Sequence, residues 1–472
     1  MSPIQQTVTR LRRRQFLALI AAAIAAPSVT RAAVRPGTKV VVVGAGVSGL
    51  IAARELQAAG CIVTILEGRT RIGGRVVTDR ARFGVPVELG AQFIHGVRNG
   101  SGTLNPLYDL AQTQRWATVP FTGNTGATYR NGSEMTTAQE DDWYALGDDF
   151  LDWLISDYKE QDSISVATSF DRAIAVYAAA RRLTRQQVID LRAYLAIEIG
   201  GDLGGDTSRI SVDAFDEDDE FGVGGDHVFR DGYDQLPDYL AAGLDVRLNC
   251  TVRSITHTAR PIRVVTTQGE FQADYVLITV PLGVLKRGSI VFRPILPTAK
   301  RVAIRRMGMG VLDKVILQFP NRFWPAGNWF TNIENAAPFG FSFTSQEASH
   351  PGSNILVAWQ FGARAVRLEA ASDAALVNAV MKEVRRTFVG IDVPAPTNTA
   401  VTRWSRDPFS RGSYSCPVIG SPRSDIATLA APVNDLLYFA GEATHADYPS
   451  TVHGALLSGQ REANAIIAKA SA

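Results

Sequence analysis

Residues 39–49 decide the fold of this chain, and their sequence is KVVVVGAGVSG. The run over Lys39–Val43 is typical of a parallel β-strand that is buried on both faces. An amphipathic helix is predicted over Leu50–Ala59 with Gly60 as its C-cap, and a second strand over Cys61–Leu66. Strand, glycine turn, helix and strand in this order predict an α/β, Rossmann-like domain.

The glycine turn and the acid beyond it predict a dinucleotide site. Gly44 permits a tight turn, Gly46 lets the backbone approach a pyrophosphate, and Gly49 allows the helix to pack closely on the strand. The helix N-terminus offers N–H groups and a partial positive charge to phosphates. Glu67 lies 23 residues after Gly44, close to the ~20 expected of an acid that holds a ribose hydroxyl. This pattern alone does not separate FAD from NAD.

The next segment, GRTRIGGR over residues 68–75, favours a flavin. Gly73 and Gly74 let the backbone lie against a cofactor, and Arg75 can meet its phosphates or the polar atoms of its ring. The acid, spacer and GGR resemble the flavin amine oxidase superfamily, which implies FAD as the cofactor. The alternative is an ordinary glycine turn that carries a surface arginine.

The carboxyl-terminal region carries a second segment of the same resemblance. AGEAT at 440–444 ends a strand, and YPSTVHGA at 448–455 opens a helix that runs to about Ala470. In the family the glutamate contacts the ribityl-phosphate region, and the helix start stabilises negative charge at the pyrimidine edge of the flavin. The cofactor-binding residues predicted here and elsewhere beyond the amino-terminal segment are Gly441, Glu442, Thr451, Val452, Val252 and Trp404.

The resemblance covers nearly all of the chain beyond residue 33. It is nearest to polyamine oxidases and to the oxidase domain of lysine-specific histone demethylases. The segments that carry it are ELGAQFIHG at 88–96, TVPLGVLK at 279–286, MGMGVLDKV at 307–315, WSRDPF at 404–409 and GSYS at 412–415.

Four catalytic candidates follow from the resemblance. Lys314 is expected near flavin N5, holding a water, with its pKa lowered by loss of solvation. Trp404 and Tyr414 are expected beside the ring, with Tyr414 forming one wall of an aromatic cage for the amine. Thr451 stands where monoamine oxidases have the second cage tyrosine. His95 is a candidate for substrate contact or proton relay, with a structural role as the alternative.

At two positions the sequence differs from related flavin oxidases, and these differences restrict how the flavin is attached and which substrates are expected. Monoamine oxidases attach their flavin through a cysteine just before the cage tyrosine, but Ser413 stands there and Cys416 is displaced. We therefore predict non-covalent FAD. L-amino-acid oxidases place a carboxylate-binding arginine after the Leu-Gly-Ala turn, where this chain reads Gln92-Phe93. Amino-acid substrates are thus disfavoured.

An acidic stretch over residues 213–220 suggests a cationic substrate. A similar stretch contacts a cationic substrate in the demethylase branch, and such a mouth would concentrate polyamines by Coulomb attraction. Asp216 and Asp218 are the predicted substrate-binding acids, together with His95, Tyr414 and Thr451. The alternative is a solvated charge run.

These observations predict FAD-dependent oxidation of an amine, with polyamines favoured. Hydride transfer would give an imine, followed by hydrolysis and reoxidation by O2 to yield H2O2. Two alternatives stay open. One is an amine dehydrogenase that passes electrons to a periplasmic acceptor such as a cytochrome, and the other is a flavin-binding module without turnover.

Composition and the first residues predict an exported, two-domain protein. The 472 residues, 46% of them apolar, exceed the usual size of one domain, and the net charge of +2 gives no sign of a nucleic-acid surface. Residues 1–33 have the basic start, apolar run and small-residue exit of a signal peptide. Arg13-Arg14 before Phe16-Leu17 favours the twin-arginine route, hence a periplasmic or secreted protein. The alternative is an uncleaved anchor, but the run is shorter than the ~20 residues of a membrane span, so no stable span is expected after signal removal.

Domain boundaries and the remaining elements follow from pattern. The FAD-binding domain is predicted from 37–115, 222–310 and 423–472, and an α+β substrate domain from 116–221 and 311–422. Helices are expected over 142–158 and 169–199, with a capping box at Thr184 and Gln187, and strands over 311–319 and 354–361. Three widely spaced cysteines predict no disulfide framework, and six scattered histidines predict no metal.

Overall fold

The computed structural model describes residues 34–121, 125–158, 168–212, 221–334 and 341–471. The predicted signal over 1–33 and the predicted substrate acids Asp216 and Asp218 lie outside the described residues. The described chain starts beside its own C-terminal helix, since the Arg35 backbone N–H donates to the Ala470 carbonyl at 3.0 Å.

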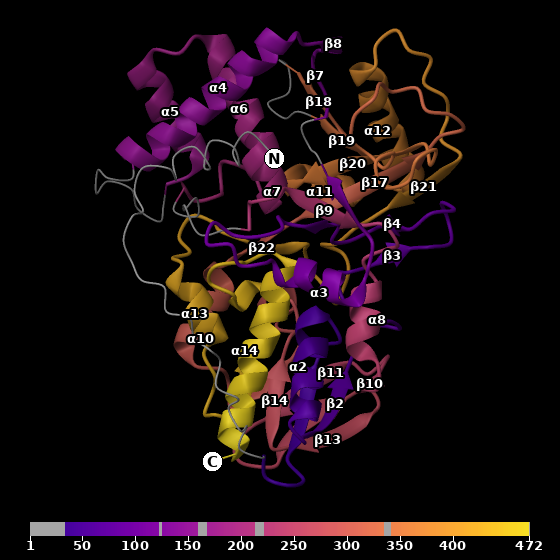
Figure 1. Ribbon diagram of the computed structural model, residues 1–472. Coiled ribbons are helices and arrows are strands. Elements are labelled where there is room, and N and C mark those ends of the chain that lie inside the picture. The colour runs from indigo at the N-terminus through magenta and orange to yellow at the C-terminus, as the bar shows by residue number, and fades with distance from the viewer. Residues whose placement is uncertain (1–33, 122–124, 159–167, 213–220, 335–340, 472) are drawn as a thin grey trace.

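A five-stranded parallel sheet is the centre of the nucleotide-binding part. Its strand order is β10 (Asp245–Arg247), β2 (Ile62–Leu66), β1 (Lys39–Val43), β14 (Tyr275–Ile278) and β23 (Leu437–Phe439). The strands are apolar because both faces are covered. Val40 and Val42 pack towards α2 (Val47–Ala58) and α14 (Val452–Ser471), which lie side by side in Figure 1.

The opposite face of this sheet packs on a second layer. Val41 and Val43 belong to the same core as residues of β11 (Val252–Thr256) and β12 (Ile262–Thr266). Those strands form a four-stranded sheet with β13 (Gly269–Ala273) and β15 (Val291–Arg293). The helices around these layers are α3 (Pro106–Gln114), α8 (Gln235–Ala241), α9 (Leu282–Arg287), α10 (Thr298–Arg306), α13 (Ser424–Ala430) and the short η4 (Glu442–Thr444).

A seven-stranded mixed sheet forms the other half of the molecule (Figure 1). Its order is β21 (Asn398–Val401), β17 (Leu312–Gln318), β20 (Ile355–Phe361), β19 (Phe341–Ser345), β18 (Trp329–Ile333), β7 (Gly126–Arg130) and β8 (Ser133–Glu134). Side chains alternate between its faces. One face, with Val315 and Leu317, packs on α12 (Asp373–Thr387), and the other carries Lys314 and Trp359, which are direct partners in the β17–β20 register.

Helices complete this half. A helical cluster contains α4 (Thr137–Trp153), η1 (Leu154–Tyr158), α5 (Phe170–Arg181), α6 (Arg185–Leu195), η2 (Ala196–Gly200) and α7 (Gly201–Leu203), while α11 (Gly362–Leu368) follows β20. The helix predicted over 169–199 is broken because Arg182 adopts a left-handed conformation at the end of α5. The capping box predicted at Thr184 and Gln187 is confirmed at the start of α6.

The predicted α/β architecture with a second, α+β part agrees with these sheets. The individual domain boundaries stay a prediction, because one small sheet crosses them: β5 (Phe93–Ile94) and β6 (Thr118–Phe121) both pair with β9 (Asp226–Phe229). The two remaining sheets are the pairs β3 (Thr78–Asp79) with β4 (Val87–Glu88), and β16 (Gly308–Gly310) with β22 (Tyr414–Cys416).

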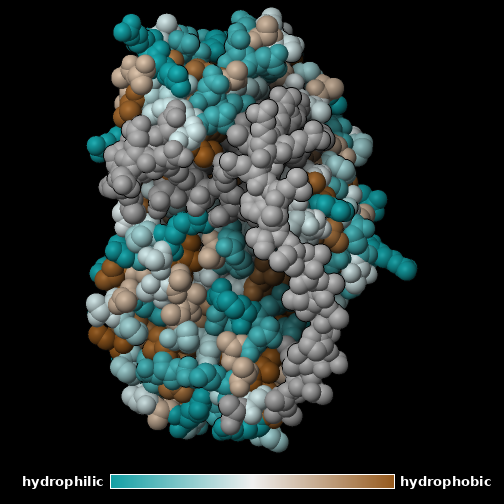
Figure 2. All heavy atoms as spheres, turned by 60° about the vertical axis from the view of Figure 1, so that its left-hand side comes forward, coloured by the Kyte–Doolittle hydropathy of each residue, from teal (hydrophilic) through white to brown (hydrophobic). Residues whose placement is uncertain are grey.

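The face shown in Figure 2 mixes hydrophobic and hydrophilic residues. Across the ranges that the structure describes, no helix combines the length and the apolar character that crossing a membrane would need.

Candidate active site

A cavity of about 870 Å³ lies between the parallel sheet and the seven-stranded sheet, since both supply its walls. This is within the range of about 300–1,000 Å³ that ligand sites occupy. One end is lined by the glycine turn after β1 and by the start of α14, and the other by Lys314, Trp359 and neighbouring aromatic side chains.

The glycine turn forms a cradle for phosphate. Gly44 has a φ of +112°, which favours glycine. A Cβ added to Gly46 would meet nothing within 4 Å, whereas one on Gly49 would lie 2.1 Å from the Gly44 carbonyl oxygen. Gly46 thus leaves open space on the cavity side, and Gly49 packs α2 against the turn. No side chain caps the N-terminus of α2, as suits an end that receives an anionic ligand.

Glu67, at the tip of β2, shapes the same turn. Its Oε2 accepts the Ala45 N–H at 2.8 Å and its Oε1 accepts the Arg69 N–H at 2.8 Å. The carboxylate is buried but lines the cavity. It therefore stands where an acid can also accept a hydroxyl of a bound ribose.

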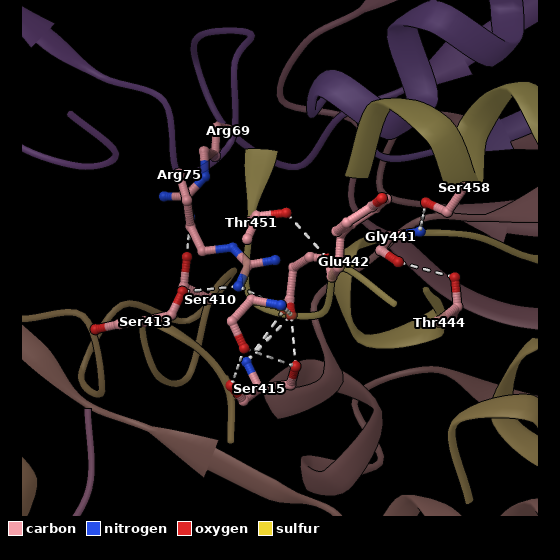
Figure 3. A network of polar contacts seen from close by, with 12 residues as sticks. Arg69, Arg75, Ser410, Ser413, Ser415, Gly441, Glu442, Thr444, Thr451 and Ser458 are labelled. Atoms are coloured by element: carbon pink, nitrogen blue, oxygen red, sulfur yellow. Dashed lines mark hydrogen bonds and ion pairs between the residues drawn. The ribbon is translucent and has the colours of Figure 1, made fainter. Parts of the chain in front are cut away.

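Arg75 and Glu442 join the two ends of the chain (Figure 3). Arg75 Nη1 donates to Glu442 Oε1 at 2.9 Å and to the Ser413 carbonyl at 2.7 Å. Glu442 Oε2 accepts the Ser415 hydroxyl at 2.6 Å and the Ser450 N–H at 3.0 Å. The arginine predicted to meet phosphates or polar atoms of the flavin and the glutamate predicted at the ribityl-phosphate region thus bind each other, and both line the cavity.

The start of α14 closes this end of the cavity. Thr451 Oγ1 accepts the Gly454 N–H at 2.9 Å and donates to the Tyr448 carbonyl at 3.0 Å. The hydroxyl therefore caps the helix, and Val452 is its first residue. The positive end of the α14 dipole adjoins the cavity, as the prediction for the pyrimidine edge requires.

Lys314 is buried on the cavity side of the seven-stranded sheet. Its Nζ donates to the carbonyls of Glu88 and Gly90 at 2.9 and 2.8 Å and to Gln92 Oε1 at 3.0 Å, and it lies 4.8 Å from the centre of the Trp359 ring. Burial lowers the pKa of Lys314 to about 7, against the opposing charge of Glu88. Three acceptors match the three N–H groups of an ammonium.

Trp404 and Tyr414 form further walls. Trp404 is 9% exposed, and a Cβ added to Gly90 would lie 3.4 Å from its ring. The Tyr414 hydroxyl donates to the Gly201 carbonyl at 3.1 Å, which holds the ring against the turn after η2. Burial raises the pKa of Tyr414 well above its usual value, so its hydroxyl stays protonated.

Two histidines lie at the rim and in the wall. His95 Nδ1 is 3.4 Å from Asp226 Oδ2, and its side chain is 52% exposed. His453 is buried, and burial lowers its pKa to about 3. Its ring contacts Phe221 and Tyr448 edge-on. His95 is the one of the two with access to solvent.

The structure brings nearly all predicted site residues within the described ranges to this cavity. Gly49 lies behind the wall, in the packing role predicted for it. The sequence interpretation missed the cavity residues Phe93, Phe121, Tyr144, Trp329, Trp359, Glu198 and Asp202. Trp359 could have been predicted from the sequence, because pairing the expected strands 311–319 and 354–361 in this register places it opposite Lys314.

The two missed acids are the most informative. Glu198 and Asp202 are four residues apart, one helical turn, and both line the cavity. Burial, together with the charges of Asp202 and Asp148, raises the pKa of Glu198 to about 8. The signal in the sequence was a carboxylate inside the apolar run Leu195–Ile199.

Comparison with known proteins identifies the family. Residues 47–467 match the description "Flavin containing amine oxidoreductase". The chain belongs to this family. The FAD cofactor predicted from the glycine turn and GGR segment is therefore confirmed, and it is bound non-covalently. The buried Cys416 is not among the residues that line the cavity. Within the described ranges, no group of three or more His, Cys, Asp or Glu side chains could hold a metal ion.

Relatives of the chain are demethylases and polyamine oxidases. Lysine-specific histone demethylase 1 homolog 2 of Arabidopsis thaliana is 36% identical over 448 residues, which are 91% of this chain and 58% of that protein. Polyamine oxidase 4 of Oryza sativa subsp. japonica is 33% identical over 459 residues, covering 92% and 89%. The chain thus spans a little over half of the demethylase relative.

A solved structure supports the fold. A redesigned putrescine oxidase double mutant superposes with a TM-score of 0.71 at 21% identity, covering 92% of this chain and 100% of that one. The predicted architecture of an FAD-binding part and a substrate-binding part is confirmed by this likeness.

Proposed function

We propose that the protein is an FAD-dependent amine oxidase that favours di- and polyamines. The observation that carries the proposal is the pair Glu198 and Asp202 on the cavity wall, with Asp202 beside Tyr414 and Glu198 beside Tyr144. A substrate with a second cation beyond its reacting amine would place that cation against the two carboxylates. The aromatic side chains of Trp359 and Trp329, stacked with ring centres 6.2 Å apart, supply an apolar path for the chain between the cations.

The residues of the chain bind, orient and exclude water. Bound FAD supplies the acceptor for the hydride from the carbon next to the amine nitrogen. Tyr414 and Trp404 limit where the amine can lie, and the aromatic wall keeps bulk water from it. Lys314 holds the segment 88–92 in place through its hydrogen bonds. Because its pKa is about 7, it can lose a proton near neutral pH, which frees a lone pair for a water or a proton.

The same cavity serves the second half of the reaction. The imine product is hydrolysed to a carbonyl compound and an amine, and O2 takes the electrons to give H2O2. An amine dehydrogenase would instead pass them to a cytochrome. Measuring peroxide released per amine consumed distinguishes these two, with one peroxide per amine expected for the oxidase.

The proposal is tested by anaerobic addition of amines to the FAD-loaded protein. Putrescine, spermidine and spermine should bleach the flavin absorbance faster than benzylamine, and a methylated lysine peptide tests the chemistry of the demethylase relatives. Absence of bleaching with every amine would reject the oxidase and leave a flavin-binding module.

We also propose export through the twin-arginine route, on the strength of Arg13-Arg14 and the apolar run that follows. This route carries folded proteins, which suits a chain that takes up its cofactor first. Replacing both arginines with lysine should leave active enzyme in the cytoplasm of the expressing bacterium, and unchanged export would contradict the assignment.

A further inference from the structure

Two buried acids lie directly behind the cavity wall. Asp313 is 4% exposed and Glu369 is 1% exposed. Asp313 precedes Lys314 in β17, so its side chain points to the opposite face of the sheet, and Glu369 is the C-cap of α11. The Asp313 carboxyl group lies next to the side chain of Glu369, which helps to raise the pKa of Asp313. Two acids in this contact cannot both be ionised without strong repulsion.

The neighbouring donors hold the outer oxygens of the pair. Asp313 Oδ1 accepts the Trp404 N–H and the Thr402 hydroxyl, both at 2.9 Å. Glu369 accepts the Ser405 N–H at 2.8 Å and also the Ser405 hydroxyl. Asp313 Oδ2 receives no protein N–H or O–H. The pair therefore anchors the cavity residue Trp404 and its neighbours Thr402 and Ser405.

No compensating cation is present in the part of the chain that the structure describes. Neither carboxyl group forms an ion pair with a described Lys, Arg or His. The Arg403 guanidinium donates to the main-chain carbonyl of Glu369 at 3.2 Å and pairs with Asp373 at 2.6 Å. A proton is thus the means by which two buried acids in contact can be neutralised.

We propose that Asp313 and Glu369 share one proton, and that this shared proton keeps Trp404 in the wall of the cavity. Asp313 then acts as a carboxylic acid that donates to Glu369 while its carbonyl oxygen accepts from Trp404. When the proton is lost, two adjacent charges repel and the anchored segment around Trp404 shifts. The inference concerns a positioning pair and does not depend on which amine is oxidised.

The direction of the titration supports this geometry. Burial, reinforced by Glu369, raises the pKa of Asp313 to about 8. In the unfolded chain the group has its ordinary value of 3.8. A raised pKa means that the folded state holds a proton that the unfolded state releases. The resulting stabilisation is complete below the unfolded value and is lost as pH rises towards 8.

Other titrating groups must be separated from this one. Lys314, on the other face of β17, has its pKa lowered to about 7 by burial, and Arg403 is paired with Asp373. Asp313→Asn isolates the acid pair. Its amide N–H₂ replaces the shared proton, and its oxygen keeps both acceptor contacts.

The decisive measurement is the unfolding equilibrium of apo wild type and Asp313→Asn between pH 5 and 8. Stability of the wild type relative to the variant should fall by about tenfold in the unfolding constant for each pH unit, as expected for one linked proton. Equal pH dependence of the two proteins would overturn the proposal. So would failure of Asp313→Asn to fold, because the amide reproduces every hydrogen bond of the protonated acid.

A control acid and a functional readout complete the test. Asp425 is also buried but is paired with Arg306 at 2.5 Å, so Asp425→Asn should destabilise throughout this pH range.

The FAD dissociation constant of the wild type, followed by flavin fluorescence, should rise about tenfold per pH unit above pH 8 if binding requires one protonated group. In Asp313→Asn it should stay constant there. In Asp313→Ala, which lacks the acceptor for Trp404, it should be raised at every pH.

Discussion

Lys314 contacts three acceptors of one short segment, and the chain contains a matched comparison for it. Lys286 Nζ likewise donates to three backbone carbonyls, those of Ile304, Arg305 and Met307, but it does not line the cavity. Each lysine therefore stabilises the fold in a similar way, while Lys314 alone of the two can act on the cofactor or the amine.

We expect Lys314→Met to slow flavin reduction or reoxidation while FAD stays bound. Rapid-mixing absorbance of the two half-reactions measures this. The pH–rate curve of the wild type should contain a group with an apparent pKa of about 7, from burial of Lys314 beside Glu88, that the variant lacks. Lys286→Met should lower thermal stability and leave both rates intact. Wild-type rates in Lys314→Met would remove this residue from the mechanism.

A second prediction at the residue scale concerns the charge of Glu198. Its pKa is about 8 because of burial and of its acidic neighbours, so its negative charge appears as pH rises through 8. Attraction of a polyamine cation should strengthen in the same direction, and cation binding should release a proton.

Above pH 8, where Glu198 carries its negative charge, replacing it with Gln removes a charge-assisted contact worth about 1.5–3 kcal/mol. We expect kcat/KM for spermidine to fall about tenfold to a hundredfold, with a smaller effect on benzylamine. Asp109→Asn changes the net charge equally but alters an exposed acid outside the cavity lining, and its kinetics should match the wild type. Equal losses for spermidine and benzylamine would contradict a role in binding a second cation.

At the scale of the element, the turn between β1 and α2 separates packing from cofactor binding. A Cβ at Gly49 would lie 2.1 Å from backbone, while one at Gly46 would meet no protein atom within 4 Å. We expect Gly49→Ala to destabilise the apoprotein by about 1–3 kcal/mol. Gly46→Ala should leave apoprotein stability unchanged and weaken FAD binding. Thermal unfolding with and without FAD checks both, and a destabilised Gly46→Ala apoprotein would contradict the open cradle.

Strand alternation explains why one residue step separates two functions. Lys314 faces the cavity and Asp313 faces α11 because adjacent strand residues point to opposite faces. A pattern of apolar residues predicted the strand over 311–319. The partners of its two charged residues come from residues 88–92 and from Glu369, and no local pattern connects segments so distant in sequence.

At the scale of the whole molecule, the cavity is assembled from both ends of the chain and its middle. Arg75 and Glu442, 367 positions apart, form an ion pair at its wall. FAD bound there would meet cavity-lining residues from both ends and the middle of the chain, so it should stabilise the fold as one unit. At a hundred times its dissociation constant, FAD should add about 2.7 kcal/mol to the free energy of unfolding. Calorimetry should show one transition that moves upward with FAD concentration, and an unmoved transition would contradict a shared site.

The cofactor-binding turn, its strands and the terminal helix could be predicted from the amino-acid sequence alone. Their signals are local: glycines where φ is positive or Cβ has no room, apolar runs for strands covered on both faces, and a helix that begins at a known motif. Such patterns can be recognised within windows of about 11–18 residues, so they do not depend on the rest of the molecule.

Tertiary packing decided the rest, because burial and proximity are properties of segments that meet only after folding. The approach of Asp202 to Tyr414 depends on how the helical cluster lies against β22. The pKa values of Lys314, Asp313 and Glu198 are displaced by desolvation and by neighbours remote in the chain. A carboxylate in an apolar run looks like an anomaly until its surroundings are assembled, and only then does it become a group that can hold a proton or a substrate cation.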